Sequence, residues 1–317
     1  YLLMLEFSHT DESIDINKII EQKKEAKSYI DREEKLIDTL AIARRKIQLF
    51  KTSAETQSLV LLIENIKKDI DINHPSFYLL PKQVCNYLEL IRGSLLYNRD
   101  IRKLEPIAID LYKTTKEQGG FTSHTLEYQL RILYILSHAL YRNQKLDTCL
   151  EYIQEIETTL NTYNLSRYNH YFAKTVALKS SIYFLTGKID EAILVIEQFL
   201  TNEITISTED ELNLKLNLLT YYSYHKEYRK ANRFFIQMHH SDGWYKKLMG
   251  QEWIFKKNSI EMLLHFEMGK DDIALNRINS IIKANNDLTE LSQYKDIIYF
   301  LKLFLSFFYS LQHRVLY

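Results

Sequence analysis

Glycine and proline are scarce in this chain, which has 7 Gly and 3 Pro among its 317 residues. Valine is rare as well. A protein built from sheets needs turn residues at the ends of its strands, and it favours β-branched side chains within them. The shortage of both therefore excludes β-sandwiches, barrels and most α/β enzymes, and it predicts an all-α fold.

The chain also lacks an excess of charge of one sign, because its 41 basic side chains are matched by 41 acidic ones. Proteins that hold nucleic acid by bulk electrostatics carry a surplus of basic residues. We therefore expect no nucleic-acid partner of that kind.

Cysteines and long apolar runs are few. Cys85 and Cys149 do not form a disulfide framework, so we expect buried, reduced thiols and a reducing, cytoplasmic compartment. The apolar run at 297–311 contains Lys302 and is shorter than the roughly 20 residues that a membrane span needs. This run favours a buried helix over an anchor, and no membrane association is expected.

Sequence motifs for catalysis or cofactor binding are absent: there is no Gly-rich phosphate loop, nucleophile elbow, His-Glu-x-x-His, Cys-x-x-Cys or EF-hand loop. The one ligand-like cluster is His239, His240 and Asp242. Adjacent histidines on a helix point about 100° apart and rarely share a metal. His138 and His265 lie among apolar neighbours and are interpreted as hydrogen-bonded packing residues. We expect a non-enzymatic protein with no metal and no cofactor.

What the chain does contain is a repeated pattern, clearest at residues 178–200. Gly187 separates two helical segments, and Ile189, Ala192, Ile196 and Phe199 recur on one face of the second. The small Ala192 would let the two helices approach closely. The segment therefore predicts a helical hairpin whose apolar face is covered by its neighbours.

The same pattern recurs roughly every 40 residues along the chain. The predicted turns fall at Arg99, Gln144, Gly187, Lys226 and Gly269. Five positions after each turn stand Leu104, Cys149, Ala192, Ala231 and Ala274, which are small in all but the first case.

Over residues 76–290 this pattern resembles the tetratricopeptide-repeat family. Gly187, Ile189, Ala192 and Ile196 occupy the family's turn and packing positions. The resemblance implies a right-handed α–α superhelix, a solenoid of about five to six hairpins. It also implies a concave groove that binds peptides. The repeats here are longer than the family's usual 34 residues, and the family's first-helix Trp and closing Pro are missing.

Two regions are predicted, with a boundary at His74-Pro75. Residues 1–75 form an N-terminal helical segment, with helices over 14–30, 35–50 and 55–70, the last two of which could form a degenerate repeat. Residues 76–317 form the repeat domain. Within it, Thr208 and Glu211 are interpreted as a capping box, and residues 241–243 as a turn.

A row of cations and amides is the candidate binding site. Thirteen residues before each predicted turn stand Asn86, Arg131, Lys174, Asn213 and Lys256. In the resembled family this position lines the groove, and some members grip peptide carboxylates there. The row is therefore a candidate ladder for an acidic peptide or a C-terminal carboxylate, above an apolar floor of Leu90, Ile135, Leu178 and Ile260. The alternative is an ordinary solvated face.

A second candidate surface is the stretch from Lys226 to Lys257, where basic residues alternate with aromatic ones: Trp244, Tyr245, Trp253 and Phe255. Such a pattern can bind nucleic acid through phosphates and base stacking. The favoured interpretation is that the tryptophans pack inside the fold and the lysines are solvated.

These observations favour a protein–protein interaction scaffold that binds a peptide or helix of a partner. One alternative is a ligand- or peptide-sensing module of a larger transcriptional or signalling regulator. A second is a helical solenoid that contacts nucleic acid.

Overall fold

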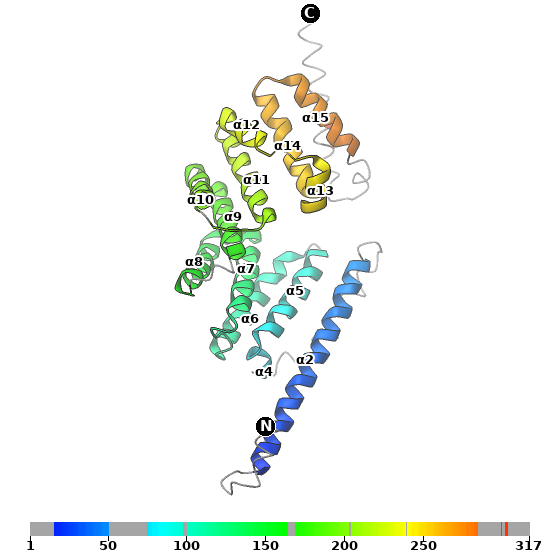
Figure 1. Ribbon diagram of the computed structural model, residues 1–317, viewed down its shortest axis with the longest axis vertical. Coiled ribbons are helices and arrows are strands. Elements are labelled where there is room, and N and C mark those ends of the chain that lie inside the picture. Colours follow the sequence, from blue (N-terminus) through cyan, green and yellow to red (C-terminus); the bar gives the residue numbers. More distant parts are fainter. Residues whose placement is uncertain are drawn as a thin grey trace, which may run out of the picture. The chain divides into compact units, whose positions relative to one another are not determined.

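The structure, a computed structural model, describes residues 16–50, 75–97, 100–163, 169–202, 204–238 and 240–284, together with 299, 302 and 303. Throughout these residues the regular elements are helices and no strand occurs, which confirms the all-α prediction (Figure 1). The chain divides into two compact units, Tyr1–Asn164 (unit 1) and Leu165–Tyr317 (unit 2). Each unit is described by itself.

Unit 1 is built around α5, which packs against α2, α6 and α7, while α7 also packs against α8. Its described elements are α2 (Ile16–Phe50), α4 (Pro75–Tyr78), α5 (Pro81–Tyr97), the 3₁₀ helix η1 (Ile101–Lys103), α6 (Leu104–Glu117), α7 (Leu126–Arg142) and α8 (Leu146–Tyr163). Residues 118–125 separate α6 from α7 and contain a Gly-Gly pair.

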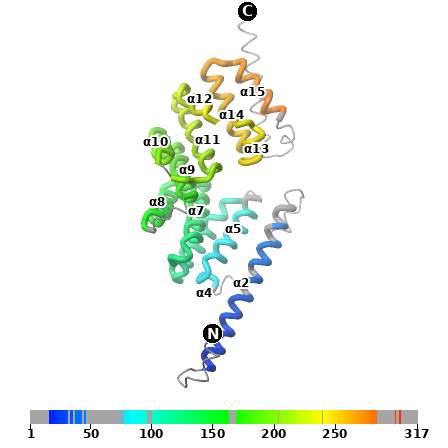
Figure 2. The backbone as a smooth tube through the Cα atoms, viewed as in Figure 1, coloured from blue at the N-terminus to red at the C-terminus, as the bar shows by residue number. Residues whose placement is uncertain are grey.

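The sequence predicted two helices, over 14–30 and 35–50, and the break between them is wrong. The structure has a single helix here, α2, of 35 residues (Figure 2). The linking residues Asp31-Arg32-Glu33-Glu34 include no Gly or Pro to end a helix. Ile19 and Leu40 are buried on one side of α2. The predicted helix over 55–70 lies outside the described residues. The predicted boundary at residue 75 falls inside unit 1 and stays a prediction.

The described part of unit 2 contains three hairpins, in which the first helix of one packs against the first helix of the next: α9 contacts α11, and α11 contacts α14. The short helix α13 packs against α14. The described helices are α9 (Asn169–Leu185), α10 (Ile189–Thr201), α11 (Thr208–Tyr224), α12 (Tyr228–Ile236), α13 (Asp242–Met249), α14 (Gln251–Glu267) and α15 (Asp271–Ala284).

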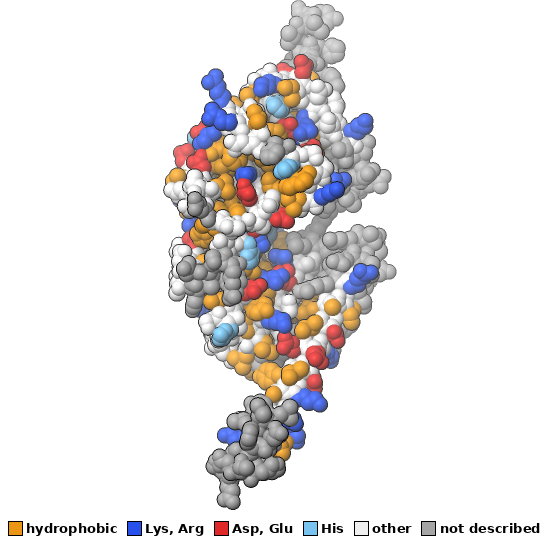
Figure 3. All heavy atoms as spheres, in the orientation of Figure 1, with side chains coloured by type: hydrophobic (Ala, Val, Ile, Leu, Met, Phe, Trp, Pro, Cys, Tyr) orange, Lys and Arg blue, Asp and Glu red, His pale blue; other side chains and the backbone are white. Residues whose placement is uncertain are grey.

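The surface mixes charges of both signs. Figure 3 shows Lys and Arg side chains interspersed with Asp and Glu on the visible face. No helix in the described ranges combines the length and the apolar character that crossing a membrane requires. Most of the apolar run at 297–311 lies outside those ranges.

The turns between paired helices fall where the repeat predicted them, and the structure shows that they share one backbone geometry. Gln144, Gly187, Lys226 and Gly269 all have a left-handed backbone, with φ of 60°, 77°, 63° and 69°. The amide that follows each of them donates to the carbonyl five residues earlier: Lys145 to Leu140, Lys188 to Tyr183, Glu227 to Tyr222 and Lys270 to His265, at 2.8–3.0 Å. This bond closes the C-terminus of a helix in the Schellman motif.

The first predicted turn shows the same bond, although Arg99 itself lies outside the described residues. The amide of Asp100 donates to the carbonyl of Leu95 at 2.8 Å. All five predicted turns therefore end a helix through the same hydrogen bond.

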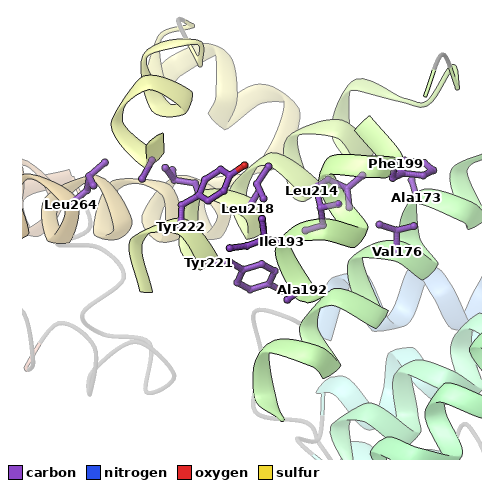
Figure 4. Packing of buried hydrophobic residues seen from close by; sticks show 13 residues of the cluster. Ala173, Val176, Ala192, Ile193, Phe199, Leu214, Leu218, Tyr221, Tyr222 and Leu264 are labelled. Carbon is purple, nitrogen blue, oxygen red and sulfur yellow. The ribbon is translucent and has the colours of Figure 1, made fainter. Parts of the chain in front are cut away.

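The residues five positions after the turns, small in all but the first case, are also buried as the repeat predicts. Leu104, Cys149, Ala192, Ala231 and Ala274 are each 0% exposed. Figure 4 shows Ala192 within a cluster of buried apolar side chains that also contains Val176, Leu218 and Leu264. A small side chain here lets the second helix lie close to the first, so that larger residues on neighbouring helices fill the space.

Two helix starts differ by one or two residues from the sequence interpretation. The cap of α11 is Ser207 rather than Thr208: Asp210 N donates to Ser207 Oγ at 3.1 Å, and Ser207 Oγ donates to Asp210 Oδ2 at 2.9 Å. Residues 241–243 are not a free turn, because Ser241 caps α13, which begins at Asp242. In both cases a serine in extended conformation accepts from the third residue on, which is the usual geometry of an N-cap.

Candidate functional site

The five residues of the predicted row are divided between the two units. Asn86 and Arg131 lie on α5 and α7 of unit 1, while Lys174, Asn213 and Lys256 lie on α9, α11 and α14 of unit 2. Each is on the first helix of a hairpin, as the repeat predicts. Their role in binding stays a prediction.

Two cations of the row already hold carboxylates of the protein itself. Arg131 Nε donates to Glu89 Oε1 at 2.8 Å, and Arg92 binds the other oxygen of Glu89 at 3.2 Å. Lys256 lies 2.9 Å from Glu252, one helical turn away. A ligand carboxylate would have to compete with these partners.

The predicted apolar floor is largely core. Leu90, Ile135 and Leu178 are 2%, 1% and 7% exposed, so they pack within the fold instead of offering a surface. Ile260 differs, because it is partly exposed and lines a pocket. This pocket offers a concave surface to a ligand and is the candidate binding site.

The pocket lies in unit 2, between the end of α11, the start of α12 and α14, and has a volume of about 340 Å³. Figure 1 shows these three helices next to one another. The lining residues are Thr220, Ser223, Tyr224, Lys226, Tyr228, Ile260, Leu263, Leu264 and Glu267.

The pocket is apolar at its base and at its rim. Leu264 is 1% exposed, whereas Tyr224 and Leu263 remain 65% and 41% exposed. The ring of Tyr224 is held edge-on against Phe184, with centroids 5.0 Å apart. Large apolar side chains that stay in water around a concavity are typical of a binding surface.

The hydroxyls in the pocket wall are used by the protein. Thr220 and Ser223 donate to carbonyls one turn earlier in α11, both at 2.8 Å. The phenol of Tyr228 donates to Glu267 Oε2 at 2.8 Å and links α12 to α14. This hydrogen bond raises the pKa of Tyr228. Lys226, in contrast, is exposed, so it is the lining residue best placed to meet a charged ligand.

A buried ionic cluster lies elsewhere in unit 2, where α13, α14 and α15 meet, and the sequence interpretation missed it. Lys257 is 3% exposed. Its Nζ lies 2.9 Å from Asp242 Oδ1 and 3.8 Å from Glu261 Oε2. Arg277 binds Glu261 and lies 3.4 Å from Asp242, and Asn258 donates to Asp242 at 3.1 Å.

This cluster is balanced, with two cations and two carboxylates. Burial opposes ionisation of Asp242, but the hydrogen bond and charge of Lys257 hold its pKa below the usual range. Because every charge has a partner within the cluster, its role is to fix three helices together. The spacing of Lys257 and Glu261, four residues apart on one helix, was the available sequence signal.

The basic and aromatic stretch is mostly packed inside. Tyr245, Trp253 and Phe255 are 0%, 6% and 5% exposed, so they offer no face on which a base could stack. Trp244 is 37% exposed and stacks on His240, with centroids 4.0 Å apart. The favoured interpretation is confirmed for Trp253 but wrong for Lys257, which is buried instead of solvated.

The histidines and cysteines are the remaining candidate ligands among the described residues. His239 lies outside the described residues, and no group of three or more His, Cys, Asp or Glu within them could hold a metal ion. Nδ1 of His265 is buried and has no hydrogen-bond partner in the described part of the chain, so the expected hydrogen bond is missing at this atom. Burial raises the pKa of the Cys85 and Cys149 thiols to about 12, which keeps them unreactive.

His138 gives the folded state a defined pH dependence. Burial, helped by the charges of Arg142 and Arg92, lowers its pKa from 6.5 to about 4. A lowered histidine pKa means that the unfolded state binds the proton first, so stability falls as the pH drops from about 6.5 toward 4. Between pH 7.5 and 5 we expect a loss of about 2 kcal/mol from this residue.

Urea unfolding at both pH values measures this loss. The variant His138→Gln, which cannot titrate, should lose about 2 kcal/mol less than the wild type over the same interval. An equal pH dependence in the two proteins would contradict the assignment to His138.

Comparison of the chain with protein-family models, with curated proteins and with solved structures found no match.

Proposed function

We propose that this protein is a non-enzymatic interaction scaffold that holds a segment of a partner protein, with the pocket between α11, α12 and α14 as the anchor point. The observation that carries the proposal is the open apolar pocket whose rim residues Tyr224 and Leu263 remain exposed. Desolvating such residues on binding contributes about 25 cal/mol for each Å² buried.

The size of the pocket favours a side chain over a cofactor. Its 340 Å³ is near the lower end of the roughly 300–1,000 Å³ that small-molecule sites occupy. A space of this size suits one or two large apolar side chains of a peptide, which commonly dominate the affinity of a protein interface.

The recurring hairpins support the same proposal. Helical repeats expose long faces that bind extended or helical segments. A tetratricopeptide-like, right-handed superhelix is part of the proposal, as is a cytoplasmic location. The packing of α9 on α11 and of α11 on α14 supports the repeat architecture within unit 2.

Selection from a displayed library of random peptides tests the proposal. We expect the full chain to enrich peptides with a common large apolar residue, and Leu263→Lys to weaken their binding by at least about 10-fold, because an ammonium would then replace part of the apolar rim.

The matched control is Leu194→Lys on α10, since Leu194 is 51% exposed and does not line the pocket. This variant should bind as the wild type does. Tyr224→Ser provides a second rim variant if Leu263→Lys loses helical signal in circular dichroism. Peptide binding that survives both rim substitutions would show that the pocket is not the anchor.

A further inference from the structure

We infer that the pocket recognises an acidic peptide segment, in which a large apolar side chain enters the pocket and neighbouring carboxylates meet a cationic edge formed by Lys226, Arg229 and Arg233. This inference rests on the proposed function and specifies the chemistry of the partner.

The three cations lie on one short stretch of chain. Lys226 lines the pocket, and Arg229 and Arg233 follow on α12, four residues apart and therefore on the same face of that helix. All three side chains are exposed. Lys226 lines the pocket, and the two arginines lie on the helix that begins with Tyr228, another lining residue.

The other charges around this edge are committed to internal contacts. Lys230 lies 2.9 Å from Glu197 and 3.4 Å from Glu227, and its ammonium stands over the ring of Tyr222 at 4.3 Å. Glu267, the acid in the pocket wall, accepts the hydrogen bond of Tyr228. Glu267 keeps its negative charge, because the phenol of Tyr228 is neutral. The four cations of residues 226–233 still outnumber the three carboxylates near them by one, so a carboxylate is the complement of this edge.

The backbone at Lys226 points to the same conclusion. Its φ of 63° is a left-handed conformation, which costs a residue with a side chain roughly 1–2 kcal/mol compared with glycine. Gly187 and Gly269 fill two of the equivalent turns without this cost, while Gln144 shares the conformation of Lys226. A lysine at this turn places an ammonium beside the apolar rim, which a glycine would not supply.

A peptide suits the site better than a nucleic acid does. Binding of single strands depends on exposed aromatic faces for base stacking. Near this edge Tyr222 is 3% exposed and already lies under Lys230, and the exposed ring of Tyr224 is held edge-on against Phe184. The base of the pocket, formed by Ile260 and Leu264, is aliphatic.

Three short labelled peptides test the inference by fluorescence anisotropy. The first has one phenylalanine flanked by glutamates on both sides, the second has the same phenylalanine flanked by lysines, and the third has alanine in place of the phenylalanine between glutamates. The first should bind at least about 10-fold more tightly than either of the others, and its affinity should fall as salt is raised.

Charge reversal at the edge provides the decisive variant. Lys226→Glu should weaken binding of the glutamate peptide by about 10-fold. It should also reduce the ratio between the affinities for the glutamate and lysine peptides. Lys188→Glu, at an exposed site beside another turn, should change neither. Arg229→Glu repeats the test if Lys226→Glu alters the turn.

The outcomes separate this inference from the proposed function. Ligands that depend on Leu263 but bind equally well with either flanking charge would overturn the acidic preference and leave the scaffold function standing. Ligands that ignore Leu263 would overturn the proposed function. A single-stranded oligonucleotide that binds as tightly as the glutamate peptide, with the same sensitivity to Lys226→Glu, would overturn the choice of a peptide.

Discussion

Replacing Lys257 by methionine is expected to lower the free energy of unfolding by about 3–5 kcal/mol, because it removes one partner from a buried ionic cluster. Lys257 is 3% exposed and bridges Asp242 and Glu261. Without its ammonium, two carboxylates would share Arg277 as their remaining charged partner within the cluster. The similar volume of methionine means that the loss would come from charge rather than from a cavity.

The adjacent residue supplies the control for this experiment. Lys256 is exposed and pairs with Glu252 on the surface, so Lys256→Met should change stability by less than about 0.5 kcal/mol. Urea unfolding followed by circular dichroism measures both variants. If the two substitutions have equal effects, the cluster does not hold α13, α14 and α15 together.

Replacing Gly120 by alanine should destabilise unit 1 by about 2–3 kcal/mol. A Cβ at this position would come far inside 3.0 Å of the carbonyl oxygen of Tyr78 and within 2.9 Å of Thr115 Cγ2. Backbone cannot move aside as a side chain can, so the loop would have to shift. The shift would break the bond from Gly120 N to Thr115 O, which is 2.9 Å long.

A second glycine should respond in the opposite direction. Gly93 lies inside α5, and a Cβ there would meet nothing within 4 Å. Gly93→Ala should therefore raise stability by about 0.5–1 kcal/mol, because alanine loses less entropy in a helix. Thermal unfolding of the two variants and the wild type measures the stability change of each. A Gly120→Ala protein more stable than the wild type would refute the close approach of residue 120 to Tyr78.

The repeat was the part of the fold that the sequence predicted best. The residues after the predicted turns, from Leu104 to Ala274, are buried as expected, because helical periodicity ties their burial to local spacing. Helix ends were predicted less well. Ser207 and Thr208 are both good capping residues, and local sequence does not decide which of two neighbours adopts the extended conformation.

The site was harder to predict, because it depends on long-range contacts. Lys257 is charged and lies beside the exposed Lys256, and it is buried because Asp242 and Arg277, 15 residues before it and 20 after it, come to the same place. The exposure of Tyr224 and Leu263 likewise follows from how α11 and α14 pack. The spacing of the repeat correctly put each residue of the row from Asn86 to Lys256 on the first helix of a hairpin. It could not show that Arg131 binds Glu89, which lies on a different helix.

The left-handed turns affect how further proteins with this hairpin should be recognised. Of the four hairpin turns whose left-handed residue is described, two have glutamine or lysine at a position where a sequence-pattern search would require glycine. A search profile should therefore leave the turn residue unspecified and weight the small or apolar position that follows it. Such a profile would also recover chains in which a different residue occupies the turn.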